Sequence, residues 1–138
     1  ISSHLTGIDI SENMISEAEK LDIYDNLIVG DIVETLSSSQ EKIDLFVALD
    51  VLIYIGDALL TFQAVRECCK PDSLFAFSVE IQEESGYSLL KSARYAHSDR
   101  YIMDQTAEIF DLVDSQTVRL RKERGNWING KVYVFRAI

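Results

Sequence analysis

Residues 43–50 read IDLFVALD, an almost continuously apolar run that ends in an acid. Strands of parallel sheets show this pattern, because helices cover both faces of such a strand. Asp57 is expected to cap the next helix, and Lys70-Pro71 to end it, because proline disfavours helical backbone before it. A second buried strand, LFAFSV at residues 74–79, follows. This succession of strand, helix and strand is typical of a parallel α/β unit.

The same alternation continues toward the N-terminus. Residues 4–10 read HLTGIDI and are expected to form a short strand, and Ser11 is expected to cap the helix that follows. Residues 26–30 read NLIVG, a further short strand that Asp31 closes, and residues 32–36 suit one helical turn. The N-terminal part therefore predicts two more strands connected through a helix.

The C-terminal part predicts a different arrangement. Residues 81–98 are polar and aromatic, and their structure stays open, whereas the apolar spacing of residues 99–113 predicts a helix. Residues 117–123 alternate in polarity, and residues 131–138 read as a strong strand. Asn129-Gly130 lies between them and is a favoured pair for a tight turn. The chain is therefore expected to end in an antiparallel hairpin.

Together these segments predict an α/β fold, a three-layer Rossmann-like sandwich with a mostly parallel sheet and a C-terminal antiparallel hairpin. The length of 138 residues fits a single domain over residues 1–138. The net charge of −10 repels phosphate backbones, so no nucleic-acid partner is expected. The densest basic stretch, residues 119–124, alternates with apolar residues and is predicted to be a solvated strand face.

The two cysteines, Cys68 and Cys69, are adjacent and lie in an apolar helical pattern. Adjacent cysteines rarely pair, so we predict buried thiols in a reducing compartment, which favours a cytoplasmic protein. No apolar run reaches membrane-spanning length, so no membrane partner is expected. No histidine or cysteine spacing suits a metal ion, and no phosphate loop or nucleophile elbow is visible.

Three of the predicted strands end in an acid, namely Asp9, Asp31 and Asp50. In open α/β sheets ligands bind at the carboxyl ends of the strands, and a carboxylate there can accept hydrogen bonds from a ribose diol or an amine. Each aspartate taken alone is equally well explained as a helix cap or a turn residue. Their recurrence at successive strand ends favours a nucleoside site.

The same segments resemble the class I S-adenosylmethionine-dependent methyltransferases over the whole chain. LTGIDISENMISEAEK (residues 5–20) resembles that family's second strand and helix, and IVGDIVETL (residues 28–36) resembles its third strand. IDLFVALDVLIYIGD (residues 43–57) resembles the fourth-strand motif, and CKPDSLFAFSVE (residues 69–80) the turn into the fifth strand. From residue 86 onward, GYSLLKSARYAHS is similar to methyltransferases joined to tetratricopeptide repeats, although no repeat is present.

The resemblance implies a binding site for the adenosine part of S-adenosylmethionine. Asp9 would hold the ribose hydroxyls, and Ile10 and Met14 would pack on the adenine. Asp31 would accept a hydrogen bond from the adenine amine, and the Ile32 amide would reach the ring. For Met14, ordinary core packing is an equally simple interpretation.

The resemblance also implies roles near the transferred methyl group. Leu49 would offer its carbonyl to the methionine ammonium, and Asp50 and Tyr54 would flank the methyl-transfer face. His97, with Tyr95 beside it, is the candidate base for an acceptor that carries a proton at the reaction pH. The simpler interpretations are a buried aromatic for Tyr54 and packing residues for Tyr95 and His97.

Two features depart from the family pattern. The usual Lys-Pro-Gly-Gly turn is here Lys70-Pro71-Asp72-Ser73. The family's first strand and glycine-rich cofactor loop, which should precede His4, are absent from this sequence. The strands that end at Asp9 and Asp50 would then have unpaired edges, which a homodimer through those edges would satisfy. We therefore predict that this chain alone binds the cofactor weakly or not at all.

Two alternatives to an active methyltransferase remain. A nicotinamide-dependent oxidoreductase also needs an acid after its second strand, although the fourth-strand motif and the C-terminal hairpin disfavour it. A non-catalytic or partner-completed methyltransferase-like domain would explain the missing loop. The acceptor, a small molecule or a protein, is not readable from the sequence, since a fold does not specify it.

Overall fold

A computed structural model describes residues 3–138 of the chain, which divides into two compact units. The N-terminal unit covers residues 1–40 and the C-terminal unit residues 41–138. The expectation of one domain over residues 1–138 stays a prediction. Within the described residues, none of the helices is both long and apolar enough to cross a membrane.

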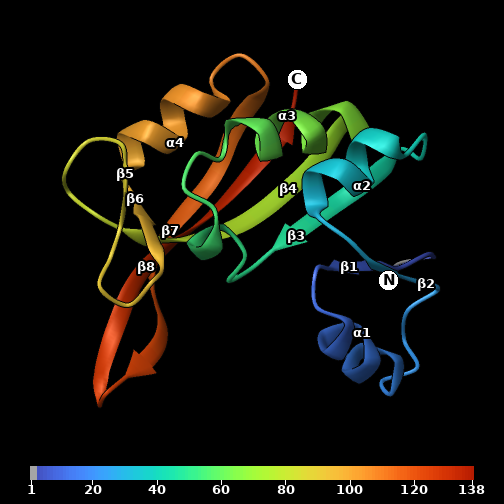
Figure 1. The fold of residues 1–138 in the computed structure, drawn as a ribbon. Helices are drawn as coiled ribbons and strands as arrows, with labels where there is room; N and C mark the ends of the chain where they lie inside the picture. Colours follow the sequence, from blue (N-terminus) through green and yellow to red (C-terminus); the bar gives the residue numbers. More distant parts are fainter. Residues whose placement is uncertain (1–2) are drawn as a thin grey trace. The chain divides into compact units, whose positions relative to one another are not determined.

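The N-terminal unit is a parallel two-stranded β-α-β-α arrangement (Figure 1). Ser11 caps the first helix as predicted, because its side-chain oxygen accepts a hydrogen bond from the Met14 amide at 3.3 Å. Asp31 caps the second helix in the same way. The elements are β1 (Thr6–Asp9), α1 (Glu12–Glu19), β2 (Asn26–Val29) and α2 (Ile32–Ser38).

The C-terminal unit is built around one long strand, β4, in a mixed sheet (Figure 1). This strand pairs in parallel with β3 and β6 and antiparallel with β8, which in turn pairs antiparallel with β7. The strands are β3 (Ile43–Ala48), β4 (Cys69–Ile81), β5 (Tyr87–Leu89), β6 (Tyr95–His97), β7 (Phe110–Glu123) and β8 (Asn126–Ala137). The helices are the 3₁₀ turn η1 (Leu52–Tyr54), α3 (Leu59–Cys68) and α4 (Asp99–Thr106).

Aromatic side chains form the core of this unit. Phe75 and Phe77 of β4 lie 4.8 Å apart by ring centroid, and Phe62 of α3 packs against both. Tyr133 and Phe135 of β8 stack on Phe77 at 5.3 and 5.7 Å. All five side chains are almost completely buried, so they supply the large apolar burial that holds α3 on the sheet.

The predicted burial of β3 on both faces is wrong for this unit. Phe46 points toward the aromatic core, where its ring centroid lies 6.3 Å from that of Phe75. Leu45 and Val47, on the opposite face of the strand, are 55% and 60% exposed. Since α3 packs on the Phe46 side, it leaves the other face of β3 uncovered. Cys68 and Cys69, by contrast, are buried free thiols as predicted, and burial raises the pKa of both.

The helix predicted for residues 99–113 is too long. The helix α4 ends at Thr106, and Phe110 already begins strand β7. Phe110 lies 5.8 Å from Phe75 and 6.2 Å from Phe135 by ring centroid and is buried. Packing of Phe110 into the sheet core therefore overrides the helical spacing of the surrounding residues.

The hairpin turn is also displaced from its predicted position. Arg124 and Gly125 form the turn, with positive φ values of 49° and 81°, as a two-residue hairpin turn requires. Asn129 and Gly130 lie inside β8 instead. A Cβ atom on Gly130 would lie 2.5 Å from the Val79 carbonyl oxygen, so glycine is needed there for close packing rather than for a turn.

Residues 81–98, whose structure the sequence left open, form the hairpin of β5 and β6. Its strands pair antiparallel, with Tyr87 opposite His97. The hairpin joins the sheet where β6 pairs with residues 80–81 at the end of β4. This placement brings the polar and aromatic segment to the carboxyl end of β4.

Candidate functional site

In the N-terminal unit, two predicted site residues lie at the same edge of the sheet. Asp9 ends β1, Asp31 follows β2, and the two strands are parallel neighbours. The Gly30 amide donates to the Asp9 carbonyl at 3.0 Å and so ties the two strand ends together. The structure therefore brings Asp9 and Asp31 to one carboxyl edge, where α/β sheets bind ligands.

Both carboxylates combine a structural role with a free oxygen. One carboxylate oxygen of Asp9 accepts a hydrogen bond from the Ser11 amide at 2.8 Å. One carboxylate oxygen of Asp31 accepts hydrogen bonds from the Val33 and Glu34 amides at 2.9 and 3.0 Å. The second oxygen of each has no hydrogen-bond partner within residues 3–138. The capping and ligand interpretations are therefore compatible at both residues.

Apolar side chains stand exposed beside these acids. Ile10 is 74% exposed and Met14 is 57% exposed, whereas Ile15 is the buried residue of α1. Core packing is therefore not the environment of Met14 in this structure. Ile32 opens α2, where the helix leaves backbone amides without a partner of its own.

In the C-terminal unit, Asp50 follows β3 in a left-handed backbone conformation with a φ of 55°. Its amide donates to the Ser78 hydroxyl at 3.0 Å, and one carboxylate oxygen lies 3.4 Å from a guanidinium nitrogen of Arg121. Leu49 and Tyr54, on either side, are 55% and 66% exposed. Tyr54 is thus a surface side chain of η1 rather than a buried aromatic.

Arg121 is a site residue that sequence reasoning missed. It was expected on a solvated strand face, but its side chain is only 19% exposed and contacts the carboxylates of Asp50, Glu80 and Glu123. The expectation holds better for its neighbours Arg119 and Lys122, which lie over the Trp127 ring on the surface. No local pattern distinguishes Arg121 from these cations, because the distinction depends on residues up to 71 positions away.

His97 is completely buried in β6. Its Nε2 lies 2.8 Å from the Gly56 carbonyl oxygen, and its Nδ1 has no partner within residues 3–138. Burial lowers the pKa of His97. Because a carbonyl oxygen can only accept, Nε2–H is the donor in the hydrogen bond to Gly56. The rings of Tyr87 and Tyr101 lie 6.0 and 5.6 Å from it. This environment is that of a packing residue, and the catalytic role stays a prediction.

Tyr95 is half-buried on the same strand, and its ring lies 6.2 Å from Tyr87. A Cβ atom on Gly56 would lie 2.7 Å from the Tyr95 ring, so the loop after η1 passes directly against this tyrosine. Burial raises the pKa of the neighbouring Tyr101, whose hydroxyl donates to Asp57 at 2.8 Å and accepts the Ala58 amide at 2.9 Å. The tyrosines and His97 therefore anchor the start of α3 to the β5–β6 hairpin.

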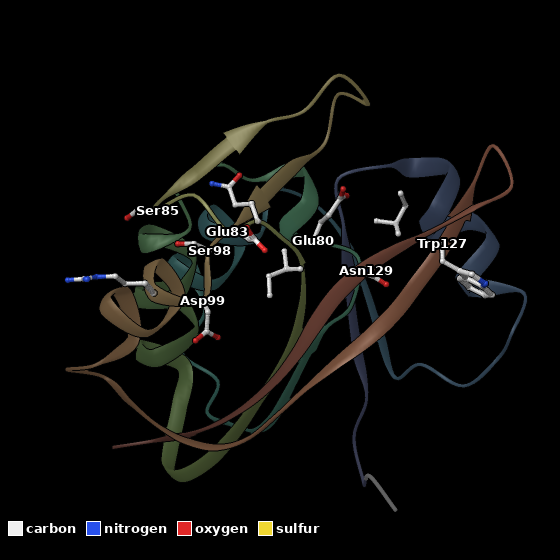
Figure 2. Close-up of a pocket in the computed structure, with 11 residues that line it drawn as sticks. Glu80, Glu83, Ser85, Ser98, Asp99, Trp127 and Asn129 are labelled. Atoms are coloured by element: carbon white, nitrogen blue, oxygen red, sulfur yellow. The ribbon is translucent and has the colours of Figure 1, made fainter.

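An open pocket of about 750 Å³ lies at the carboxyl end of β4 (Figure 2). Glu80 and Glu83 come from the end of β4 and the loop beyond it, Asp99 from α4 and Trp127 from β8. Lys131 and the Tyr133 hydroxyl donate to Asp99 at 2.5 and 2.7 Å, and the Lys131 bond in particular lowers the pKa of Asp99. Within residues 3–138, no group of three His, Cys, Asp or Glu side chains is placed to hold a metal ion.

The sequence profile of a family described as a methyltransferase domain matches residues 1–96. This chain belongs to that family. A comparison with curated proteins found no match.

Solved structures share the fold of this methyltransferase-domain chain. A S-adenosylmethionine-dependent methyltransferase from Methanosarcina mazei superposes with a TM-score of 0.72 at 18% identity, over 95% of this chain and 80% of that one. The N-methyltransferase NodS from Bradyrhizobium japonicum, in complex with S-adenosylhomocysteine, gives 0.74 at 17% identity, over 97% and 66%. Magnesium protoporphyrin IX methyltransferase from Synechocystis, with bound S-adenosylhomocysteine, gives 0.70 at 17%, over 98% and 64%.

These comparisons confirm the predicted family and its Rossmann-like α/β fold. Within residues 3–138, the N-terminal sheet has one parallel strand pair, and the C-terminal sheet has two parallel and three antiparallel pairs. The association with tetratricopeptide repeats and the missing first strand stay predictions.

Proposed function

We propose that this protein transfers a methyl group from S-adenosylmethionine to a small-molecule or protein acceptor. The observation that carries the proposal is the pair of strand-end aspartates, Asp9 and Asp31, within a methyltransferase-family domain. Each keeps one carboxylate oxygen free at the edge where such sheets bind nucleosides. The cofactor of the proposed reaction is therefore S-adenosylmethionine, held at the carboxyl ends of the strands.

The residues of the N-terminal unit fit the adenosine part of that cofactor. The free oxygen of Asp9 suits a ribose diol, and that of Asp31 suits the adenine amine, because both ligand groups are hydrogen-bond donors. The exposed side chains of Ile10 and Met14 offer an apolar surface for the adenine ring. The amide of Ile32 is the donor that we assign to a ring nitrogen.

Within the C-terminal unit, Leu49, Asp50 and Tyr54 are the residues that we assign to the methionine part and the methyl-transfer face. A bound sulfonium supplies an activated methyl group, so the protein mainly positions the acceptor and excludes water. For an acceptor that carries a proton, His97 is our candidate base, with Tyr95 beside it. Because His97 is buried, this role requires the β5–β6 hairpin to open toward the acceptor.

A partner-completed domain is the second candidate, and one feature of each unit favours it. Among the described residues, β1 pairs only with β2, and β3 pairs only with β4. Each strand therefore keeps an unpaired edge, and β3 also exposes Leu45 and Val47. A homodimer through such edges, or a further strand, would satisfy these groups. Light scattering tests the homodimer, and a monomer at high concentration would count against it.

Calorimetric titration with S-adenosylmethionine and S-adenosylhomocysteine tests the main proposal. We expect micromolar binding if the chain is the active enzyme, and weak or no binding if a partner has to complete the site. Asp9→Asn and Asp31→Asn should each weaken binding at least tenfold, because a carboxylate accepts stronger hydrogen bonds than an amide (about 1.5–3 kcal/mol for a charged acceptor). NAD should not bind.

Matched controls separate the outcomes of this titration. Asp22→Asn makes the same substitution in the same unit, at a residue away from the strand ends, and should leave affinity unchanged. Absence of binding would favour the non-catalytic or partner-completed domain over the active enzyme. Tight stoichiometric binding by residues 1–138 would support the site and contradict the expected weak binding of this chain.

A further inference from the structure

One arginine joins the ends of β3 and β4 in the C-terminal unit. The Arg121 guanidinium directs a different nitrogen at each of three carboxylates: Asp50 at 3.4 Å, Glu80 at 2.8 Å and Glu123 at 3.1 Å. Asp50 follows β3 and Glu80 lies near the end of β4, so two strand ends share one cation. The planar guanidinium can contact several carboxylates at once, which an ammonium group cannot do with the same geometry.

An irregularity in β7 directs this arginine inward. The pairing of β7 with β8 shifts between Arg119 and Arg121, so Leu120 is an extra residue in the strand. Bulges of this kind change the direction of a side chain and are common beside active sites. The Leu120 side chain occupies the space above Gly130, where a Cβ atom would lie 2.3 Å from it. Gly130 therefore makes room for the bulge that aims Arg121 at Glu80.

Asp50 is held from two sides by other strands. The Ser78 hydroxyl of β4 accepts a hydrogen bond from the Asp50 amide at 3.0 Å, and the Arg121 guanidinium of β7 contacts the Asp50 carboxylate. Its φ of 55° is a conformation that non-glycine residues rarely adopt, and such residues persist where their surroundings hold them and cluster at functional sites. The second carboxylate oxygen has no partner within residues 3–138, and the side chain is 54% exposed. One face of the carboxylate is thus held while the other stays accessible.

We propose that Arg121 is a positioning residue of the methyl-transfer site, which holds the Asp50 carboxylate and offsets its negative charge. The inference rests on the proposed function, which assigns Asp50 to the methyl-transfer face. The cofactor carries a positive sulfonium, whereas the product S-adenosylhomocysteine carries a neutral thioether. The charge balance of Asp50 and Arg121 therefore sets how strongly the site prefers cofactor over product.

The ratio of the two dissociation constants measures this balance. Titrations of the protein with S-adenosylmethionine and S-adenosylhomocysteine give the ratio for each variant. Arg121→Gln leaves the Asp50 charge without its counter-charge, so the preference for the cofactor should rise roughly threefold to tenfold. Asp50→Asn should lower the preference by a similar factor. The double variant, and Arg121→Lys with its charge retained, should return close to the wild-type ratio.

Arg119→Met is the control, because it removes a cation two residues away that lies over Trp127 and touches none of the three carboxylates. It should leave the ratio unchanged. Circular dichroism checks that each variant is folded, and Arg121→Met, which also removes the charge, provides the test if Arg121→Gln does not fold.

Three outcomes are distinguishable. Opposite shifts of the ratio for Arg121→Gln and Asp50→Asn support the inference. Equal loss of affinity for both ligands in every variant means that Arg121 is only structural and overturns it. If the wild-type protein binds neither ligand, the proposed function itself fails, and the inference fails with it.

Discussion

The two units hold their strand-end aspartates in different ways. In the N-terminal unit, Asp9 and Asp31 bond backbone amides two or three residues ahead, at the start of the next helix. In the C-terminal unit, Asp50 is held by Ser78 and Arg121, which lie 28 and 71 residues away. Local capping can be predicted from a short segment, whereas the second arrangement requires the whole sheet.

Removal of the Arg121 side chain should be the most destabilising change. Arg121→Met leaves Glu80, which is 9% exposed, without its cation, and breaking a buried ion pair costs about 3 kcal/mol. Urea denaturation measures this loss of unfolding free energy. The double variant Arg121→Met with Glu80→Met should recover most of it, and Arg119→Met should cost less than about 1 kcal/mol. Equal costs for the two arginines would mean that Arg121 is a surface residue after all.

Gly130→Ala tests the bulge that directs Arg121. The added Cβ atom would lie 2.3 Å from Leu120 and 2.5 Å from the Val79 carbonyl oxygen, so overpacking should cost about 2 kcal/mol. Adding Leu120→Ala should restore only part of the stability, because the contact with the backbone oxygen remains. The same denaturation experiment reports both values. A neutral Gly130→Ala would show that the glycine is not needed for this packing.

The buried imidazole of His97 should make stability depend on pH. Its pKa is lowered in the folded protein, so between that pKa and the unfolded value of about 6.5 the unfolded chain binds more protons. Stability is therefore complete above about pH 6.5 and falls as the pH decreases, by at most about 1.4 kcal/mol per pH unit. Thermal unfolding of wild type and His97→Gln between pH 5 and 8 measures this. Identical pH profiles would contradict a buried neutral imidazole.

Asp31→Ala should have the smallest effect and tests the local arrangement. Loss of the cap of α2 should cost about 1 kcal/mol, because the Val33 and Glu34 amides lose their acceptor. Asp31→Asn keeps an oxygen at the same place, so it should retain most of the unfolding free energy. It should still lower the affinity for the cofactor. Thermal unfolding and titration of the same two variants separate the two roles. A stable Asp31→Ala variant would show that the cap contributes nothing.

The sequence predicted well those elements that depend on neighbouring residues. The strands that end at Asp9 and near Asp31, the Ser11 cap, the buried cysteines and the C-terminal hairpin all follow from local patterns that the structure retains. The methyltransferase family was predicted from the same segments. Prediction from the sequence was less successful for residues that suit two environments. Phe110 was predicted to lie in a helix, but it begins strand β7 and packs in the sheet core.

Periodicity and capping act over a few residues, so the alternation of strands and helices and the acids at the strand ends could be predicted without a structure. Three features could be seen only in the folded chain: Gly130 packs under Leu120 instead of forming a turn, Leu45 and Val47 are exposed, and Arg121 contacts Asp50. These outcomes depend on which strands lie side by side. Hydrogen bonds and ion pairs between residues 28 to 71 positions apart leave no local trace in the sequence.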